Sequence, residues 1–184
     1  FEGSAVLMAI GHSHVLSAVS VATVTHGPGL TNCVTALTEG VRARRPVVLF
    51  AGDTAIENPQ NLQNIDQREI VKATGAGFEQ VRSPEKISDD VATAFFRAKE
   101  EKRPIVLNMP ADYMWQEVNY SPIIHQTFNA PTTITSGQIF EQAIGLIASA
   151  KRPLILAGIG AVDARDELIR LAKRLDAILT TTLK

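Results

Sequence analysis

The chain has 184 residues, of which 45% are hydrophobic and 20% are charged, and its formal net charge is −1. This length fits one ordinary domain or one and a half smaller ones, and the composition is sufficient to bury a core. The nearly neutral charge gives no electrostatic basis for binding nucleic acid or an anionic membrane.

The single cysteine, Cys33, excludes an intrachain disulfide and suits a reducing compartment. We interpret Cys33 as a small packed residue, although a helix N-terminus could lower its pKa. No signal peptide is visible and no apolar run is long enough to cross a bilayer, so the expected location is cytoplasmic. The missing initiator Met suggests an internal fragment.

Helices and strands alternate in the hydrophobic pattern of the first part of the chain. The predicted helices cover residues 2–12, 30–43 and 66–73, and a longer one opens at Ser83 and Pro84 with Ile87, Val91, Ala94, Phe95 and Ala98 on one face. The predicted strands cover residues 19–25, 46–51, 78–81 and 104–109, and a polar loop runs from residue 53 to about residue 64.

The periodicity fades after Trp115, and the prolines in residues 119–134 predict a linker. A new unit is expected to begin at residue 135. Its predicted elements are a helix with Ile139, Ala143, Ile144 and Ile147 on one face, a strand at 154–157, a helix at 163–175 and a strand at 177–182. The predicted domains are therefore residues 1–118 and 135–184.

A short motif of two cations, a proline and three aliphatic residues occurs at residues 44–49, 102–107 and 151–156. The cations suit a helix C-terminus, and the proline cannot prolong that helix. A non-alternating aliphatic triplet is expected of a strand buried on both faces. Each copy therefore predicts a junction from a helix to a parallel strand, and the fold class is α/β with a doubly wound, mostly parallel sheet.

Residues 23–32, Thr-Val-Thr-His-Gly-Pro-Gly-Leu-Thr-Asn, join a β-branched strand to a helix through a tight turn. Such a corner offers free backbone N–H groups and the positive end of a helix dipole to a ligand. Its two glycines let the backbone approach that ligand closely. Glu2 lies 25 residues before Gly27 and adds a carboxylate to the pattern.

Glu2, the helix after it and a strand ending in Thr-x-Gly-Pro-Gly-x-Thr-Asn together resemble the pyrimidine-binding domain of thiamine diphosphate enzymes. The acetolactate synthase-like group is the nearest branch, although that group usually has His before the Glu, where this chain has Phe1. The resemblance covers essentially the whole chain. It implies that residues 1–118 are this domain without its first strand, and that residues 135–184 begin the Rossmann-like central domain.

The resemblance implies a catalytic role for Glu2. In this family the carboxylic acid hydrogen-bonds the aminopyrimidine of the cofactor and favours the imino tautomer, which generates the ylide. We expect the apolar run from Ala5 to Ile10 to wall this carboxyl group and raise its pKa. Without the family pattern, Glu2 is simply an acid that favours a helix start.

The resemblance also makes Pro28, Gly29 and Asn32 predicted cofactor contacts, because the family turn lies under the aminopyrimidine. Gln67 is predicted near the cofactor and substrate, and a shift of one residue in the alignment would place Asp66 there instead. The structural alternatives are helix initiation at the turn and an exposed polar loop around Gln67. Mg²⁺ is expected to bind through a domain absent from this chain, so no metal ligand is assigned.

Three other motifs are weaker indications of a functional site. His12 and His14 do not share a helix face and predict no metal site, whereas His26 is a lesser candidate for substrate contact. Residues 158–160, Gly-Ile-Gly, give only a weak dinucleotide signal because Asp163 stands where the third Gly would be. Some relatives hold FAD or a nucleotide in this domain and others leave it empty, so FAD is an open alternative.

The resemblance implies a thiamine diphosphate-dependent 2-oxo acid decarboxylase or carboligase, that is, a lyase or transferase whose active site forms between subunits. We therefore expect a homodimer or homotetramer built through the pyrimidine-binding domain, and a fragment that is inactive alone. Two alternatives stay open. One is a non-catalytic α/β module that binds a nucleotide or anion, and the other is an FAD-centred protein with a vestigial thiamine site.

Overall fold

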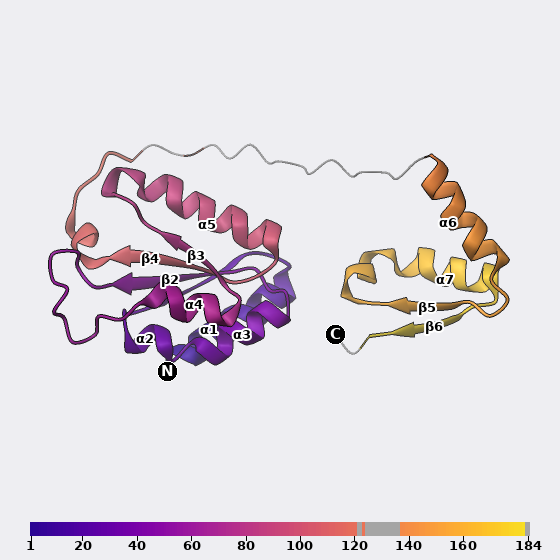
Figure 1. The fold of residues 1–184 in the computed structure, drawn as a ribbon, viewed down its shortest axis with the longest axis horizontal. Helices are drawn as coiled ribbons and strands as arrows, with labels where there is room; N and C mark the ends of the chain where they lie inside the picture. Colours follow the sequence, from indigo (N-terminus) through magenta and orange to yellow (C-terminus); the bar gives the residue numbers. More distant parts are fainter. Residues whose placement is uncertain (121–122, 124–136, 183–184) are drawn as a thin grey trace. The chain divides into compact units, whose positions relative to one another are not determined.

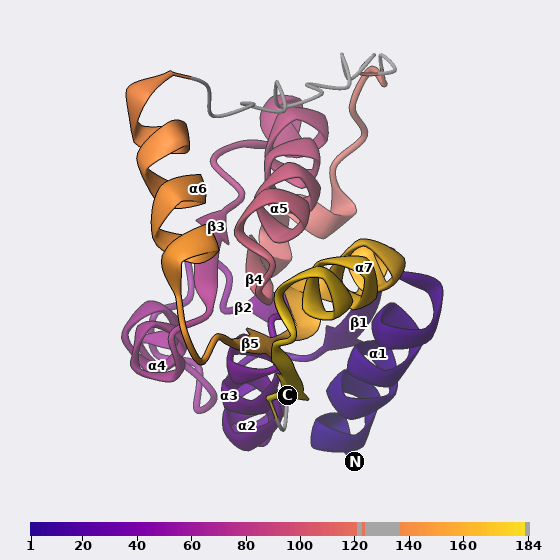
Figure 2. The same cartoon turned by 90° about the vertical axis from the view of Figure 1, so that its right-hand side faces the viewer.

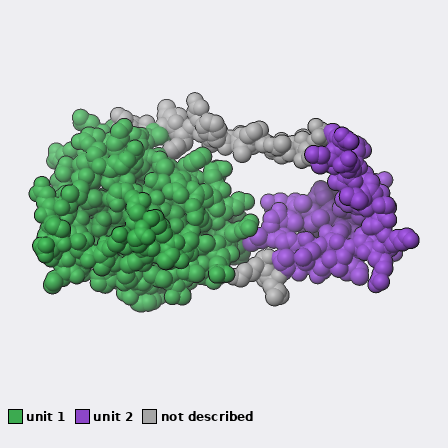
Figure 3. Space-filling model, viewed as in Figure 1, with its two compact units in different colours: residues 1–126 green, residues 127–184 purple. Residues whose placement is uncertain are grey.

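The structure is a computed structural model that describes residues 1–120, 123 and 137–182. It contains two compact units, residues 1–126 and residues 127–184, which Figure 3 shows in different colours. The boundary between them falls inside the predicted linker at 119–134, most of which lies outside the described residues. Each unit is therefore described by itself.

Four parallel strands form the sheet of the first unit in the order β1-β2-β4-β3. Their bounds are β1 (Ser20–Val24), β2 (Val47–Asp53), β3 (Gly77–Gln80) and β4 (Ile105–Pro110). The two central strands are apolar along nearly their whole length, and every residue of β4 is buried. Such strands are typical of a parallel sheet covered on both faces, as the sequence predicts.

Helices cover both faces of this sheet, which confirms the doubly wound fold. The helices α1 (Glu2–Leu16), α3 (Val34–Arg42) and α4 (Gln67–Thr74) pack on one face, and α5 (Ile87–Glu101) packs on the other. Figures 1 and 2 show α5 above the sheet with α3 and α4 below it. Side chains alternate between the two faces along β2. Val47 and Leu49 therefore pack between the sheet and α3, whereas Val48 packs between the sheet and α5.

The three copies of the cation-proline-aliphatic motif have the same structural role. Each copy leads into a strand, and the carbonyl of its proline accepts the backbone N–H that begins the neighbouring parallel strand. The donor and acceptor pairs are Ser20 and Pro46 at 3.2 Å, Gly77 and Pro104 at 2.9 Å, and Ile178 and Pro153 at 3.3 Å. The predicted helix-to-strand junctions are confirmed.

Two predicted helices differ in detail. The helix predicted at 30–43 is divided into a short α2 (Pro28–Thr31) and α3, and the segment after Ser83 begins with a 3₁₀ turn, η1 (Pro84–Lys86), before α5. Within α5, Ala94 and Ala98 are fully buried whereas Phe95 is 37% exposed. The small alanines let the helix approach the sheet closely, which leaves the larger ring at the margin of the contact.

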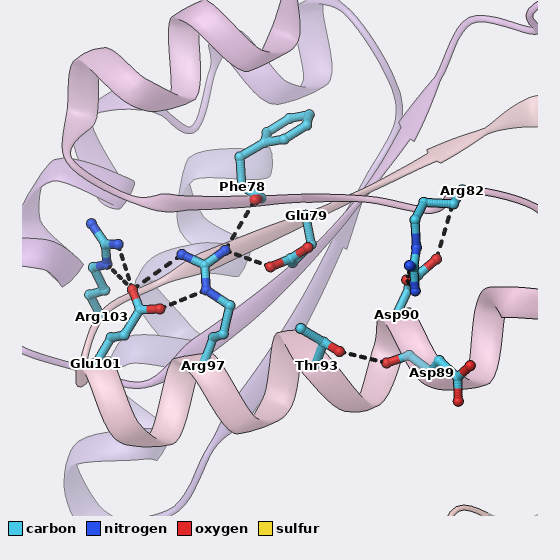
Figure 4. A network of polar contacts seen from close by, with 9 residues as sticks. All are labelled: Phe78, Glu79, Arg82, Asp89, Asp90, Thr93, Arg97, Glu101 and Arg103. Atoms are coloured by element: carbon cyan, nitrogen blue, oxygen red, sulfur yellow. Dashed lines mark hydrogen bonds and ion pairs between the residues drawn. The ribbon is translucent and has the colours of Figure 1, made fainter.

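Charged side chains tie α5 to the edge strand β3 (Figure 4). The Arg97 guanidinium contacts the Glu79 carboxylate at 2.6 Å and the Glu101 carboxylate at 2.6 Å. Nearer the start of α5, the buried Asp90 carboxylate accepts both the backbone N–H and the side-chain Nε of Arg82. The helix is thus linked both to β3 and to the segment that follows it.

The second unit contains α6 (Gln138–Ser149), β5 (Leu154–Ala157), η3 (Ile159–Ala164), α7 (Arg165–Leu175) and β6 (Ile178–Thr181). Its two strands are parallel, as predicted. The apolar residues predicted on one face of α6 are exposed, Ile139 at 75% and Ile144 at 45%. Among the described residues of the whole chain, no helix is long and apolar enough to span a membrane.

Candidate active site

The turn after β1 is shaped by close backbone packing. Gly27 has φ +62° and ψ −115°, and a Cβ atom there would lie 2.4 Å from the carbonyl oxygen of Gln63. Both the backbone angle and the lack of space require glycine at this position. Gly29 is similarly confined, since its Cβ would lie 2.7 Å from the Thr25 methyl group. Pro28 begins α2 and is exposed.

Glu2 and Asn32 meet beside this turn. The Nδ2 group of Asn32 donates a hydrogen bond to Glu2 Oε2 at 3.0 Å, although the two residues are 30 positions apart. A Cβ atom at Gly3 would lie 3.0 Å from the carbonyl oxygen of Asn32, so the start of α1 packs directly on the end of α2. The structure therefore brings the predicted residues Glu2, Gly29 and Asn32 together around one corner.

The electrostatics of Glu2 differ from the prediction. Its own backbone N–H and then the Asn32 amide hydrogen-bond the carboxylate and hold the pKa of Glu2 below its usual value. The predicted apolar wall does not enclose this carboxylate, because Val6 is buried in the core and Leu7 and Met8 face outward. The expectation of a raised pKa is therefore wrong for this chain alone.

Gln67 lies behind the turn and is only 3% exposed. Its Oε1 accepts the backbone N–H of Gly27 at 2.8 Å, and its Nε2 donates to the carbonyl of Gly52 at 2.9 Å and to Asn108 Oδ1 at 2.5 Å. Both ends of the amide are thus engaged inside the protein. Its contact with a cofactor stays a prediction. The alternative residue, Asp66, caps α4 by accepting the N–H of Glu69 at 3.1 Å.

Sequence reasoning missed the polar residues behind Gln67. Asn108, which is 1% exposed, donates through Nδ2 to Asp53 Oδ2 at 2.5 Å and to Gln80 Oε1 at 2.9 Å. A signal was visible in the sequence, because Asn108 interrupts an apolar strand and a buried polar side chain needs partners. Nothing in the sequence pattern indicates which residues those partners are.

Three buried side-chain atoms have no hydrogen-bond partner among the described residues: Ser13 Oγ, His26 Nε2 and Thr54 Oγ1. His26 and Thr54 each lie just beyond the carboxyl end of a strand, β1 and β2 respectively.

His12 Nδ1 forms a hydrogen bond with Ser20 Oγ at 2.8 Å. Within the part of the chain that the structure describes, no group of three or more His, Cys, Asp or Glu residues could hold a metal ion.

Cys33 is a packed residue, as predicted. It is fully buried, and its Sγ donates to the carbonyl of Gly29 at 3.3 Å. Burial, and secondarily the negative charge of Glu2, raises the pKa of the Cys33 thiol to about 11. A thiol with such a pKa is a poor nucleophile at neutral pH, so the cysteine contributes packing to the corner.

Family models match both units of the chain. Residues 1–72, which include the corner and Gln67, match the thiamine pyrophosphate enzyme N-terminal TPP binding domain, and residues 140–184 match the central domain of the same enzymes. The chain belongs to the thiamine pyrophosphate-dependent enzyme family. Thiamine pyrophosphate is another name for thiamine diphosphate, so the resemblance seen in Glu2 and the Gly-Pro-Gly turn is confirmed.

Individual relatives in this family include two kinds of enzyme. A sulfoacetaldehyde acetyltransferase from Castellaniella defragrans is 33% identical over 184 residues, covering 96% of this chain and 30% of that protein. An acetolactate synthase large subunit from Corynebacterium glutamicum is 29% identical over 182 residues, covering 95% of this chain and 29% of that protein. The chain thus spans less than a third of the length of these relatives.

The fold also matches a solved structure. The crystal structure of benzoylformate decarboxylase from Polynucleobacter necessarius superposes with a TM-score of 0.80 at 21% sequence identity. The match covers 98% of this chain and 35% of that protein. It supports the thiamine diphosphate-binding fold that the sequence predicts.

Proposed function

We propose that this chain is the cofactor-activating part of a thiamine diphosphate-dependent decarboxylase or carboligase, a lyase or transferase that acts on 2-oxo acids. The observation that carries the proposal is the contact between Glu2 and Asn32 beside the Gly-Pro-Gly turn. Thiamine diphosphate, when bound, supplies a centre that accepts electrons from a carbon next to a carbonyl group. The protein's part is to orient that cofactor and to manage one proton.

The residues of the corner fit an aminopyrimidine ring. A carboxyl group pairs with a ring nitrogen, and Pro28, which is exposed at the start of α2, and Gly29 behind it add no long side chain to the corner. Glu2 is proposed to hold the proton at its carboxyl group, with Asn32 fixing the orientation of that group at 3.0 Å. A bound ring would displace water from Glu2 and raise its pKa toward a value at which the carboxyl group can share a proton.

Mg²⁺ and FAD would bind outside the corner. We propose that Mg²⁺ is bound with the diphosphate by a further domain. FAD is an alternative ligand for the second unit, where a cavity of about 460 Å³ lies at the carboxyl ends of β5 and β6 and is lined by Gly158, Arg165 and Thr181 among mostly apolar residues. A yellow full-length protein with flavin absorbance would favour this second cofactor.

The outward face of α1 supports the proposed homodimer or homotetramer. Leu7, Met8 and Val15 are 51%, 69% and 78% exposed on this helix. Large exposed apolar side chains that gather on one element are typical of a surface that packs against another subunit. We therefore propose that the subunit interface lies on α1, whose first residue is Glu2, so that assembly and the active-site corner are close in the chain.

Replacement of Glu2 by Gln in the full-length protein tests the proposed function. We expect the variant to bind thiamine diphosphate with magnesium in calorimetry, and to release carbon dioxide from 2-oxo acids at least about a hundredfold more slowly than the wild type, because the amide cannot exchange the proton. A wild type that binds no thiamine diphosphate, or a variant with unchanged turnover, would favour the non-catalytic module instead.

A further inference from the structure

We propose that Asp53, Asn108 and Gln67 form a positioning relay that fixes the direction of the Gly27 N–H and thereby holds the Gly-Pro-Gly turn in place. The proposal rests on the proposed function, because the position of the turn matters for activity only if the turn carries the cofactor. None of the three relay residues needs to touch the cofactor itself. They act through Gly27 and are positioning residues.

The order of donors and acceptors gives the relay its direction. A carboxylate can only accept hydrogen bonds, so Asp53 requires that Asn108 turn its Nδ2 toward it, at 2.5 Å. The Oδ1 of Asn108 must then face Gln67, where it accepts Nε2 at 2.5 Å. That orientation leaves the Oε1 of Gln67 to accept the Gly27 N–H at 2.8 Å.

The carboxylate of Asp53 therefore decides how the Asn108 amide points, and Asn108, the Gly27 N–H and the Gly52 carbonyl all favour the same orientation of the Gln67 amide. A primary amide by itself can turn over and exchange its oxygen for its nitrogen, because the two ends have almost the same shape. If Gln67 turned over, its NH₂ group would face the Gly27 N–H and its oxygen would face the carbonyl of Gly52. Both contacts would then be repulsive, and the turn would lose its anchor.

Burial makes the relay costly to break. Asn108 is 1% exposed and Gln67 is 3% exposed, so water cannot replace a lost partner in the folded chain. The relay also joins three separate parts of the sheet, because Gly27 follows β1, Asp53 ends β2 and Asn108 lies in β4. An apolar contact would hold these strands together equally well, but it would not specify the direction of a single N–H group.

Exchanging the carboxylate of Asp53 and the amide of Asn108 is the direct test, in the full-length protein. Asn108→Asp alone places two carboxylates at hydrogen-bonding distance with no proton donor between them. The double variant Asp53→Asn, Asn108→Asp restores one amide and one carboxylate. In it the amide at position 53 donates to the carboxylate at position 108, which still accepts from Gln67. Asn119→Asp, an exposed change of the same chemistry, is the matched control.

We expect Asn108→Asp to raise the Kd for thiamine diphosphate by about tenfold or more and to lower kcat at saturating cofactor, since one unsatisfied buried group has an effect of this size. The double variant is expected to recover both values to within about threefold, an interval small beside the tenfold effect. Hydrogen exchange of peptides that contain Gly27, measured without cofactor, should be faster in Asn108→Asp and return to the wild-type rate in the double variant.

Each outcome has a separate meaning. If exchange at Gly27 in Asn108→Asp matches that in Asn119→Asp, or if a folded double variant fails to recover, the relay is wrong. If exchange changes while Kd and kcat do not, Asn108 is merely structural and its positioning role is overturned. If the wild type binds no thiamine diphosphate, the proposed function fails, and exchange at Gly27 alone still judges the relay. If Asn108→Asp does not fold, recovery in the double variant decides.

Discussion

At the scale of single residues, Gly27 carries the strictest requirement in the corner. Its positive φ strains any residue with a side chain, and a Cβ would meet the carbonyl oxygen of Gln63 rather than a movable side chain. We expect Gly27→Ala to lower the free energy of unfolding by about 1–3 kcal/mol. Denaturant unfolding of the full-length protein measures this change.

Gly145 provides the control for that substitution. It lies in α6, where an added methyl group would have no atom within 4 Å, and its φ is not positive. Gly145→Ala should therefore leave stability unchanged or raise it by about 0.5–1 kcal/mol, because alanine loses less backbone entropy in a helix. Equal losses in both variants would contradict the special role of the Gly27 conformation.

The sequence predicted some of these residues and not others, for a physical reason. Glu2, Pro28, Gly29 and Asn32 belong to local patterns whose spacing is visible along the chain, and the structure brings them to one corner. The partners of Asn108 come from three other segments, and which segments meet depends on strand order. A single sequence does not reveal the order of the strands in the sheet.

At the scale of elements, α5 is attached to the sheet edge by the buried carboxylate of Asp90 and by partly buried charges around Arg97 (Figure 4). The side chain of Asp90 is 4% exposed and serves two donors of Arg82, whereas the neighbouring Asp89 is 52% exposed and pairs with Lys86. We expect Asp90→Ala to lower the free energy of unfolding by roughly 1–3 kcal/mol, since two hydrogen bonds to a buried carboxylate are lost.

The same substitution at Asp89 is the matched control. Because exposed ion pairs contribute little, Asp89→Ala should change the free energy of unfolding by less than about 0.5 kcal/mol. Urea unfolding midpoints of the two variants give the comparison. A loss at Asp89 as large as that at Asp90 would mean that helix propensity, not the buried contact, sets the effect.

The pH dependence of the α5 attachment follows from Glu101. Hydrogen bonds from Arg97, and then from Arg103, hold the pKa of Glu101 below its usual value in the folded chain. A lowered folded-state pKa means that the stabilisation is present above the unfolded-state pKa and is lost as pH falls through the folded-state pKa. Stability should therefore fall on acidification below about pH 4.5, and less steeply in Glu101→Gln.

Thermal unfolding at several acidic pH values tests this expectation, and Glu100→Gln is the control because Glu100 is an exposed neighbour on the same helix. The two Gln variants should differ in their acid slopes. If both retain the wild-type slope, Glu101 is not linked to folding through its charge.

At this scale the sequence predicted most of the architecture. The strands and the prolines that precede them followed from residue type, and the aliphatic triplets that begin β2 and β4 are buried as expected. The expectation of burial is wrong for the third triplet in this chain, because Leu154 and Leu156 in β5 are 60% and 61% exposed. The break between α2 and α3 was not predicted, since the apolar pattern continues across Asn32 and Cys33. The break depends on how the turn packs, which is a tertiary effect.

At the scale of the whole molecule, the exposed face of α1 predicts assembly. Met8 is 69% exposed on a helix whose other face is buried in the core. We expect Met8→Glu in the full-length protein to reduce the particle mass toward that of one subunit, because a charge would be buried without a partner at the interface. Light scattering after size-exclusion chromatography measures the mass.

Lys99→Glu on α5 is the comparison, since this residue is exposed on the opposite side of the sheet and should leave the mass unchanged. A Met8→Glu protein with the wild-type mass would place the subunit contact elsewhere. The sequence predicted an oligomer only through the family resemblance. The surface that would form it became visible once the structure showed which side of α1 is left uncovered.

The relay residues also set an order for the formation of the corner during synthesis. The Gly27 N–H can form its hydrogen bond only after Gln67 has been synthesised, 40 residues later in the chain. Gln67 can bond Asn108 only after another 41 residues. Contacts so distant in sequence form late, because the intervening loop must first be closed. A nascent chain whose β4 is still inside the ribosome would thus contain all the residues of the Glu2 and Gly-Pro-Gly motif. Its turn would nevertheless lack the hydrogen bonds that hold it in place.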